Sequence, residues 1–411
     1  MAARRWLGAI AMAGLLNLNS IPAVIAEEAE EDSYSSYLFG DAGGVRSYLD
    51  KHGVTFESIL TNEVVGVVSG GAQTGDWRNH GIYSLSAELD TEKAGLWDGG
   101  TAFVNLFQIY GNSPLEIVGD IMTTSNIDAP NQFLVYEAWY AHSFLDDRVS
   151  VLAGINDFNS TFYMSEYGLN LLHSVFGFGN EFAQANPATY PVSGLGVVLS
   201  AKPTENTYIY QGIYDGNPGS AADDAAPRFN LGGKDGVLSV TEVGFLAPED
   251  ERDKSYYKFA LGYWHSSAVY TDVAGNEKSS SDGFYHLGEH SLFTESDPAQ
   301  GLGAFYQVGV TSESSFQMDR YYGLGFTYTG LIPCRDEDVT SLGFAWGING
   351  KKFRDSTEGA EYAEKVIELT HRTKVNDWLS LQPDLQYVMN PGTDSTLDDA
   401  LVVGLRVEVA M

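Results

Sequence analysis

The chain has 411 residues, of which 44% are apolar, and a formal net charge of −32 at neutral pH. This apolar content excludes a disordered chain, and the negative field argues against nucleic acid as a partner because phosphate backbones would be repelled. A field of this sign also disfavours a path for anions and favours a neutral or cationic solute.

Residues 1–26 have the pattern of a secretory signal peptide. Arg4 and Arg5 precede an apolar stretch from Trp6 to Leu16, and the small residue Ala26 is followed at once by two glutamates. No later apolar run reaches the roughly 18 residues that a spanning helix needs. The exported chain is therefore expected to be either soluble or a β-barrel. Its single cysteine, Cys334, excludes an internal disulfide.

Residues 27–53 form an acidic spacer that we expect to precede the first strand and to contain a short helix. Arg46 in this segment is expected to be structural, through capping or pairing at one end of the fold.

The rest of the chain, 54–411, alternates apolar and polar residues with a period of two, which is typical of strands. Leu379, Leu381, Leu385 and Tyr387 share one face, and the glutamines and serine between them share the other. About 16 strands are predicted, near 54–68, 80–90, 100–110, 134–144, 148–156, 194–202, 206–214, 237–246, 256–265, 283–293, 302–311, 320–329, 338–348, 364–375, 378–389 and 399–411.

The connections between these strands alternate between short turns and long loops. Short turns lie at 146–147, 202–206, 296–300 and 376–377, and the long connections at 69–79, 111–133, 157–193, 215–236, 266–282 and 349–363. Short turns on one side and long loops on the other are typical of bacterial transmembrane barrels. The sequence therefore predicts one all-β domain, a transmembrane antiparallel β-barrel.

The longest connection, 157–193, is rich in aromatic residues, among them Phe158, Phe162, Tyr163 and Phe176. Such a loop would expose too much apolar surface if it stood in water. In a barrel we expect it to fold into the lumen and narrow the channel, whereas in a soluble protein it would be a lid.

Several segments resemble one family, the carbohydrate-selective, OprB-type porins. The matching stretches run in order through nearly the whole mature chain: Leu38 to Arg46, Val65 to Gly71, Tyr136 to Tyr140, Gly154 to Asp157 with Phe162, Ser165, Glu166 and Tyr167, Gly212 to Asn217, and Ser380 to Val388 with Asn390 to Gly392. The resemblance implies a 16-stranded barrel in the outer membrane of a Gram-negative type envelope. It also implies passive diffusion of sugars, often monosaccharides, with no cofactor and no reaction.

Two positions depart from the family pattern. Ala42 stands where the family usually has Trp, and the chain ends in Ala410 and Met411 where such barrels usually end in an aromatic residue. The expected partners are sugar solutes, outer-membrane lipid and lipopolysaccharide, and, during biogenesis, the barrel-assembly machinery.

The candidate residues for the solute path are polar groups that could bond sugar hydroxyls and an indole that could cover the apolar face of a sugar ring. They are Glu63, Glu137, Trp139, Asp157, Glu166 and, at the lip, Arg320.

One motif could indicate metal chemistry. His286, Glu289 and His290 match an H-x-x-E-H zinc pattern, but they lie in a predicted strand. Residues four apart in a strand are about 13 Å apart, so the two imidazoles are not expected to share an ion. No metal and no catalytic residue is predicted.

Two other functions remain open. A general, cation-preferring porin would have the same barrel, and the net charge favours it. An exported soluble β-rich glycosidase or lectin would need an acid pair or a cleft, and it would not explain the alternation of short and long connections.

Overall fold

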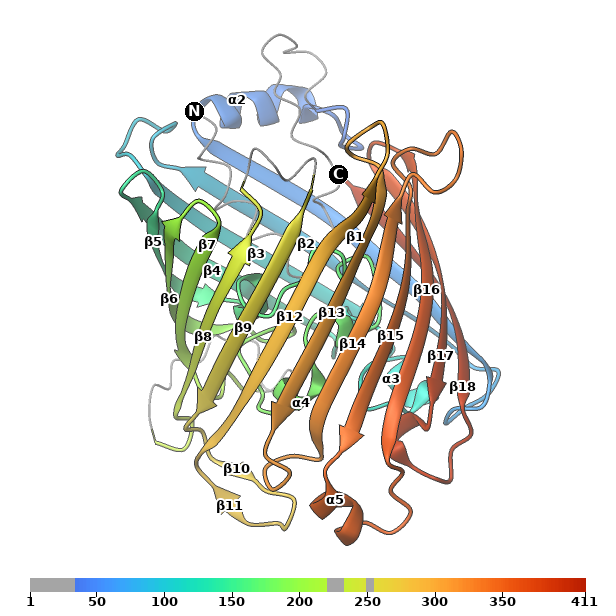
Figure 1. Ribbon diagram of the computed structural model, residues 1–411. Helices are drawn as coiled ribbons and strands as arrows, with labels where there is room; N and C mark the ends of the chain where they lie inside the picture. Colours follow the sequence, from blue (N-terminus) through green and yellow to red (C-terminus); the bar gives the residue numbers. More distant parts are fainter. Residues whose placement is uncertain (1–33, 220–232, 249–254) are drawn as a thin grey trace.

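The computed structural model describes residues 34–219, 233–248 and 255–411. In this part of the chain, sixteen strands form one closed barrel in which every strand pairs antiparallel with its neighbours (Figure 1). The barrel closes where β1 pairs with β18, with Ile59 opposite Ala410 and Glu63 opposite Arg406. The predicted all-β barrel of about 16 strands is confirmed. The proposed signal peptide, 1–26, lies outside the described residues.

The strands begin and end close to the predicted positions. The barrel strands are β1 Val54–Ser69, β2 Trp77–Asp90, β3 Gly100–Gly111, β4 Gln132–Phe144, β5 Val149–Asn156, β6 Gly194–Thr204, β7 Thr207–Asp215, β8 Val237–Leu246, β9 Tyr257–Ser266, β12 Ser281–Thr294, β13 Gly301–Thr311, β14 Met318–Thr329, β15 Val339–Asn349, β16 Ala363–Asn376, β17 Leu379–Met389 and β18 Ala400–Ala410. Two short strands, β10 Tyr270–Thr271 and β11 Glu277–Lys278, form a separate hairpin that the sequence pattern did not predict.

The outer face of the barrel is apolar because alternate residues of each strand point away from the lumen. On β17, Leu385 and Tyr387 are 42% and 39% exposed, whereas Gln382 and Gln386 are buried inside. The same outward exposure recurs around the barrel, for example at Leu199 on β6. This surface matches the hydrocarbon of a membrane, so the soluble alternative does not fit the fold. Among the described residues, no helix is both long and apolar enough to cross a bilayer.

The two ends of the barrel differ in the length of their connections. The end near α2 carries the tight turns, such as 205–206 and 377–378, and it also holds the last strand's C-terminus (Figure 1). The opposite end carries the long loops, including the β10–β11 hairpin and α5 Lys351–Ser356. By the usual pattern of such barrels, the first end is periplasmic and the second is extracellular.

Two short helical segments precede β1: a 3-10 turn, Ala42–Gly44, and α2 Val45–Lys51. Arg46 of α2 is buried and donates hydrogen bonds to the carbonyl oxygens of Phe56, at 2.6 Å, and of Met411. Its guanidinium also lies 3.6 Å from the ring centroid of Tyr37. Arg46 therefore joins the first and last strands at the seam of the barrel, in line with the structural role expected for it.

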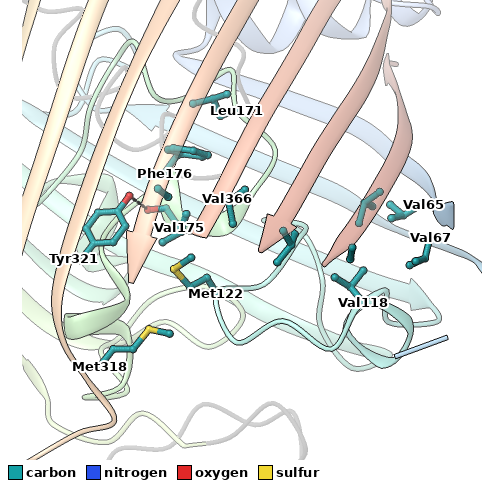
Figure 2. Close-up of a cluster of buried hydrophobic side chains, with 14 of the residues drawn as sticks. Val65, Val67, Val118, Met122, Leu171, Val175, Phe176, Met318, Tyr321 and Val366 are labelled. Atoms are coloured by element: carbon teal, nitrogen blue, oxygen red, sulfur yellow. Dashed lines mark hydrogen bonds between the residues drawn. The ribbon is translucent and has the colours of Figure 1, made fainter. Parts of the chain in front are cut away.

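Connecting chain occupies part of the lumen. Two long stretches of connecting chain, 112–131 and 157–193, fold inward from the extracellular end and carry short helices, α3 Leu115–Val118 in the first and α4 Asn180–Ala183 in the second. Figure 2 shows their buried side chains, such as Met122 and Phe176, packed together with Met318 and Val366 from the wall. The barrel thus has a hydrophobic core inside its lumen.

Candidate functional site

The loop 157–193 lies inside the lumen and packs against the inner wall. Phe158, Phe162 and Phe182 in this loop are fully buried. The ring of Phe182 stacks on Trp264 of β9 with centroids 4.6 Å apart, and that of Tyr163 stacks on Tyr285 of β12 at 4.0 Å. These contacts remove from water the apolar side chains for which the sequence predicted an inward fold of this loop.

Carboxylates of the wall hold this loop by its backbone amide groups. Each lies on the inward face of a strand and is buried, and each accepts hydrogen bonds from the loop. Glu242 of β8 accepts from Tyr163 at 2.9 Å, Glu289 of β12 from Tyr167 at 3.1 Å, and Glu368 of β16 from Leu172 at 2.5 Å and His173 at 3.0 Å. We call Glu242, Glu289 and Glu368, together with Glu364 described next, the anchor carboxylates.

The loop 112–131 is held in the same way and was not predicted to enter the lumen. The fourth anchor carboxylate, Glu364 of β16, accepts hydrogen bonds from the amides of Ile121, at 3.0 Å, and Met122, at 2.8 Å. The two loops are joined to each other, since the backbone N–H of Asn126 donates a hydrogen bond to the backbone carbonyl of Leu172 at 2.8 Å. Two connected loops therefore lie inside the lumen.

Glu63, the first candidate, lies at the junction of barrel seam and loop. Its carboxylate accepts a hydrogen bond from Arg406 Nε of β18 at 2.5 Å and one from Ser125 Oγ of the loop 112–131 at 2.7 Å. His80 Nε2 lies 3.1 Å away. Glu63 is only 2% exposed. It positions the loop from within the wall and offers little surface to a solute.

Glu137 and Asp157 are brought together by a β-bulge at Tyr136. Asn105 pairs with Glu137 and Leu106 with Val135, so Tyr136 is an extra residue and both Tyr136 and Glu137 face the lumen. Asp157 accepts a hydrogen bond from the hydroxyl of Tyr136 at 2.6 Å, and its own amide donates to Glu137 at 3.3 Å. Both carboxylates are buried, and they fix the start of the loop 157–193.

Trp139 lies two residues beyond Glu137 on the same face of β4. Its ring stacks on Phe103 of β3, with centroids 5.1 Å apart and planes 28° from parallel. It is 5% exposed, so one of its faces is already covered.

Glu166 and Arg320 lie apart from the other candidates. Glu166 is exposed in the loop 157–193, between Ser165 and Tyr167, which bond to the same anchor carboxylate, Glu289. Arg320 precedes Tyr321, whose hydroxyl donates to a loop carbonyl inside the lumen, so Arg320 is on the outward face of β14. It pairs with Asp319 at 3.1 Å.

The histidines of the H-x-x-E-H motif do not converge. The motif lies in β12, where Glu289 faces inward as an anchor carboxylate while His286 and His290 are exposed on the other face. Within residues 34–219, 233–248 and 255–411, no group of three or more His, Cys, Asp or Glu side chains is arranged to hold a metal ion.

The periplasmic mouth is lined by paired charges. Arg372 bonds Glu408 at 2.9 Å and Lys374 bonds Glu337 at 2.6 Å, around a hollow formed by β1, β16, β17 and β18. These paired charges present both hydrogen-bond donors and acceptors around the hollow.

Comparison with known proteins extends along most of the chain. The family model described as "Carbohydrate-selective porin, OprB family" matches residues 74–411. Porin B of Pseudomonas aeruginosa is 25% identical over 452 residues, covering 99% of this chain and 97% of the relative. The putative porin QuiX of Acinetobacter baylyi is 22% identical over 406 residues, covering 91% and 92%. The high-pH structure of Pseudomonas putida OprB has a TM-score of 0.83 at 21% identity and covers 93% of this chain and 100% of that one.

Proposed function

Because the chain belongs to the OprB family of carbohydrate-selective porins, we propose that it lets glucose-like monosaccharides diffuse passively across the outer membrane into the periplasm. The observation that supports this proposal is the pair of joined loops inside the lumen, both held by the anchor carboxylates. A fixed, polar constriction can select by shape and hydrogen bonding while binding weakly enough for the solute to leave. Lipid and lipopolysaccharide surround the barrel, and the barrel-assembly machinery inserts it.

Among the six candidates, Glu166 is the one proposed to contact the solute directly. It is exposed, and its neighbours Ser165 and Tyr167 are fixed by Glu289 at 2.9 Å and 3.1 Å. A carboxylate in a fixed position can accept hydrogen bonds from sugar hydroxyls. Glu63, Glu137 and Asp157 support this role by positioning the loops, and Trp139 shapes the wall beside them. Arg320 is not assigned to the path.

The alternative function is a general porin that prefers cations. The net charge of −32 favours it, since an acidic protein raises the local concentration of cations. The two functions differ only in how the constriction ranks solutes.

Solute influx into liposomes that carry the purified, detergent-extracted protein distinguishes them. The solutes are glucose, a disaccharide, an amino acid of similar size to glucose and a salt. Glucose entering faster than the amino acid supports the sugar-selective function. Entry ranked only by size and positive charge would replace it with the general porin.

The variant Glu166→Gln tests the proposed contact residue. Loss of one charge-assisted hydrogen bond, about 1.5–3 kcal/mol in favourable cases, is expected to reduce glucose influx about tenfold at low concentration and to leave salt influx within about twofold. Glu358→Gln is the matched control, because Glu358 is an exposed carboxylate of the extracellular loop that follows α5. Equal glucose influx in both variants would remove Glu166 from the path.

A further inference from the structure

An aromatic cluster lies on the outward face of the barrel at its extracellular end. Tyr322 of β14 pairs in register with Trp346 of β15, and their ring centroids are 6.0 Å apart. Tyr362, just before β16, continues the row, with its ring 6.4 Å from that of Trp346. Tyr322 and Tyr362 are 38% and 44% exposed. We call Tyr322, Trp346 and Tyr362 the outer aromatic cluster.

Three cations surround this cluster. Lys365 pairs in register with Trp346, and its ammonium lies 5.6 Å from the indole centroid. The guanidinium of Arg354, on α5, lies 4.8 Å from the centroid of Tyr362. Arg320 precedes Tyr322 by two positions on the same face of β14.

Two of the three cations carry charge that no carboxylate balances. Arg320 pairs with Asp319, but among the described residues neither Lys365 nor Arg354 has a carboxylate oxygen within ion-pair distance. Within the described part of the chain, Arg354 donates a hydrogen bond only through its Nε, to the carbonyl of Asn349 at 3.2 Å. Its remaining donors, and those of Lys365, are available to an anion.

The height of the cluster on the barrel wall indicates which kind of anion could reach it. One row further toward the periplasm, the outward face is apolar, with Leu324 and Ile367 46% and 42% exposed. On the other side lies α5, among the extracellular loops (Figure 1). The cations therefore stand at the boundary between the hydrocarbon and the outer aqueous side, where the headgroups of the outer leaflet lie.

We propose that this cluster is a binding site for the phosphorylated headgroup of an outer-leaflet glycolipid. Lys365 and Arg354 bond the phosphate, the outer aromatic cluster covers the apolar face of the headgroup sugar, and the acyl chains run along Leu324 and Ile367. In a chain of net charge −32, an anionic lipid is repelled by the protein as a whole. Unpaired cations at the headgroup level give such a lipid a specific place to bind.

Binding of purified lipid A to the full-length protein in detergent tests this site. The probes are lipid A with its two phosphates and the same lipid after their removal. At about 1 kcal/mol for each basic residue near a charged lipid surface, Lys365→Gln with Arg354→Gln is expected to weaken binding of the phosphorylated lipid about thirtyfold. Binding of the dephosphorylated lipid is expected to be weak in both proteins and equal between them.

The control is Lys234→Gln, which removes an extracellular-loop cation paired with Glu277 at 2.7 Å, and it is expected to bind phosphorylated lipid A like the unaltered protein. Unchanged glucose influx in the double variant shows that the barrel is intact. Equal affinity of the double variant and the unaltered protein would overturn the proposal. Displacement of lipid A by millimolar inorganic phosphate, or equally tight binding of phosphatidylglycerol, would also overturn it, since the site would then accept any anion or any anionic lipid.

Discussion

Replacing Glu63 by Gln is expected to destabilise the barrel and loosen its inner loop. Glu63 and Arg406 are 2% and 6% exposed and bond across the seam between β1 and β18. In the variant, the buried guanidinium of Arg406 keeps Asn126 as its other side-chain partner. Ser125 loses a charged acceptor at the same time.

The magnitude follows from these contacts. Breaking a buried ion pair by removing one partner costs about 3–5 kcal/mol, because the remaining charge is uncompensated. The amide oxygen of Gln can still accept one hydrogen bond, which retains about 1 kcal/mol. The expected loss in the free energy of unfolding is therefore about 3 kcal/mol. The Glu63→Gln and Arg406→Gln double variant is expected to lose less than the sum of the two single variants, by about 2 kcal/mol.

The assay is reversible urea unfolding in detergent micelles, followed by the fluorescence of the six tryptophans that lie after residue 26. Glu166→Gln is the matched control, since an exposed carboxylate should change stability by about 0.5 kcal/mol or less. A loss under about 1 kcal/mol for Glu63→Gln, with strictly additive effects in the double variant, would refute the reasoning that this pair fastens the seam.

Three further predictions concern the seam, the outer belt and the response to acid. Arg46→Ala is expected to destabilise the barrel by about 2 kcal/mol, because two carbonyl oxygens lose a charged donor, and urea midpoints measure this. Leu385→Arg, on the lipid-facing side of β17, should cost about 2–4 kcal/mol in bilayer refolding assays, while Leu331→Arg in the 330–338 turn should cost little; equal costs would contradict the assigned outer face. Hydrogen bonds from Ser47 hold the pKa of Asp41 below its ordinary 3.8, so the stabilisation of α2 is present above that value and is lost as the pH falls through the lowered pKa. Ser47→Ala should therefore expose the N-terminal segment to an acid-active protease at a higher pH than in the unaltered protein.

The barrel could be predicted because period-two alternation reports directly on strands with one face in lipid. Leu385 and Gln386 lie on the faces that the pattern assigned to them. The bulge at Tyr136 could not be predicted, because it shifts the alternation by one residue and places both Tyr136 and Glu137 inside. A pattern with a fixed period gives no warning of such a shift.

The anchor carboxylates were missed for a different reason. Glu364 and Glu368 alternate inward on a strand whose outward residues, such as Ile367, are apolar, and that signal is in the sequence. Their partners, however, are backbone amides some 200 residues away, such as that of Leu172. An amide group looks the same in every residue, so the sequence carries no mark of which loop each carboxylate holds. The stacking of Trp139 on Phe103 could not be predicted either, because it depends on the pairing register of β3 and β4, which the sequence pattern does not give.

The anchor carboxylates also set the order in which the pore can form during folding. The loop 157–193 is synthesised early, but it is tied to β8, β12 and β16, which follow it in the chain. Its hydrogen bonds cannot form until those strands have curled round to meet it. The barrel wall must therefore form before the inner loops are fully fixed, and a chain with β16 unpaired would lack the hydrogen bonds that Glu364 and Glu368 accept from both loops.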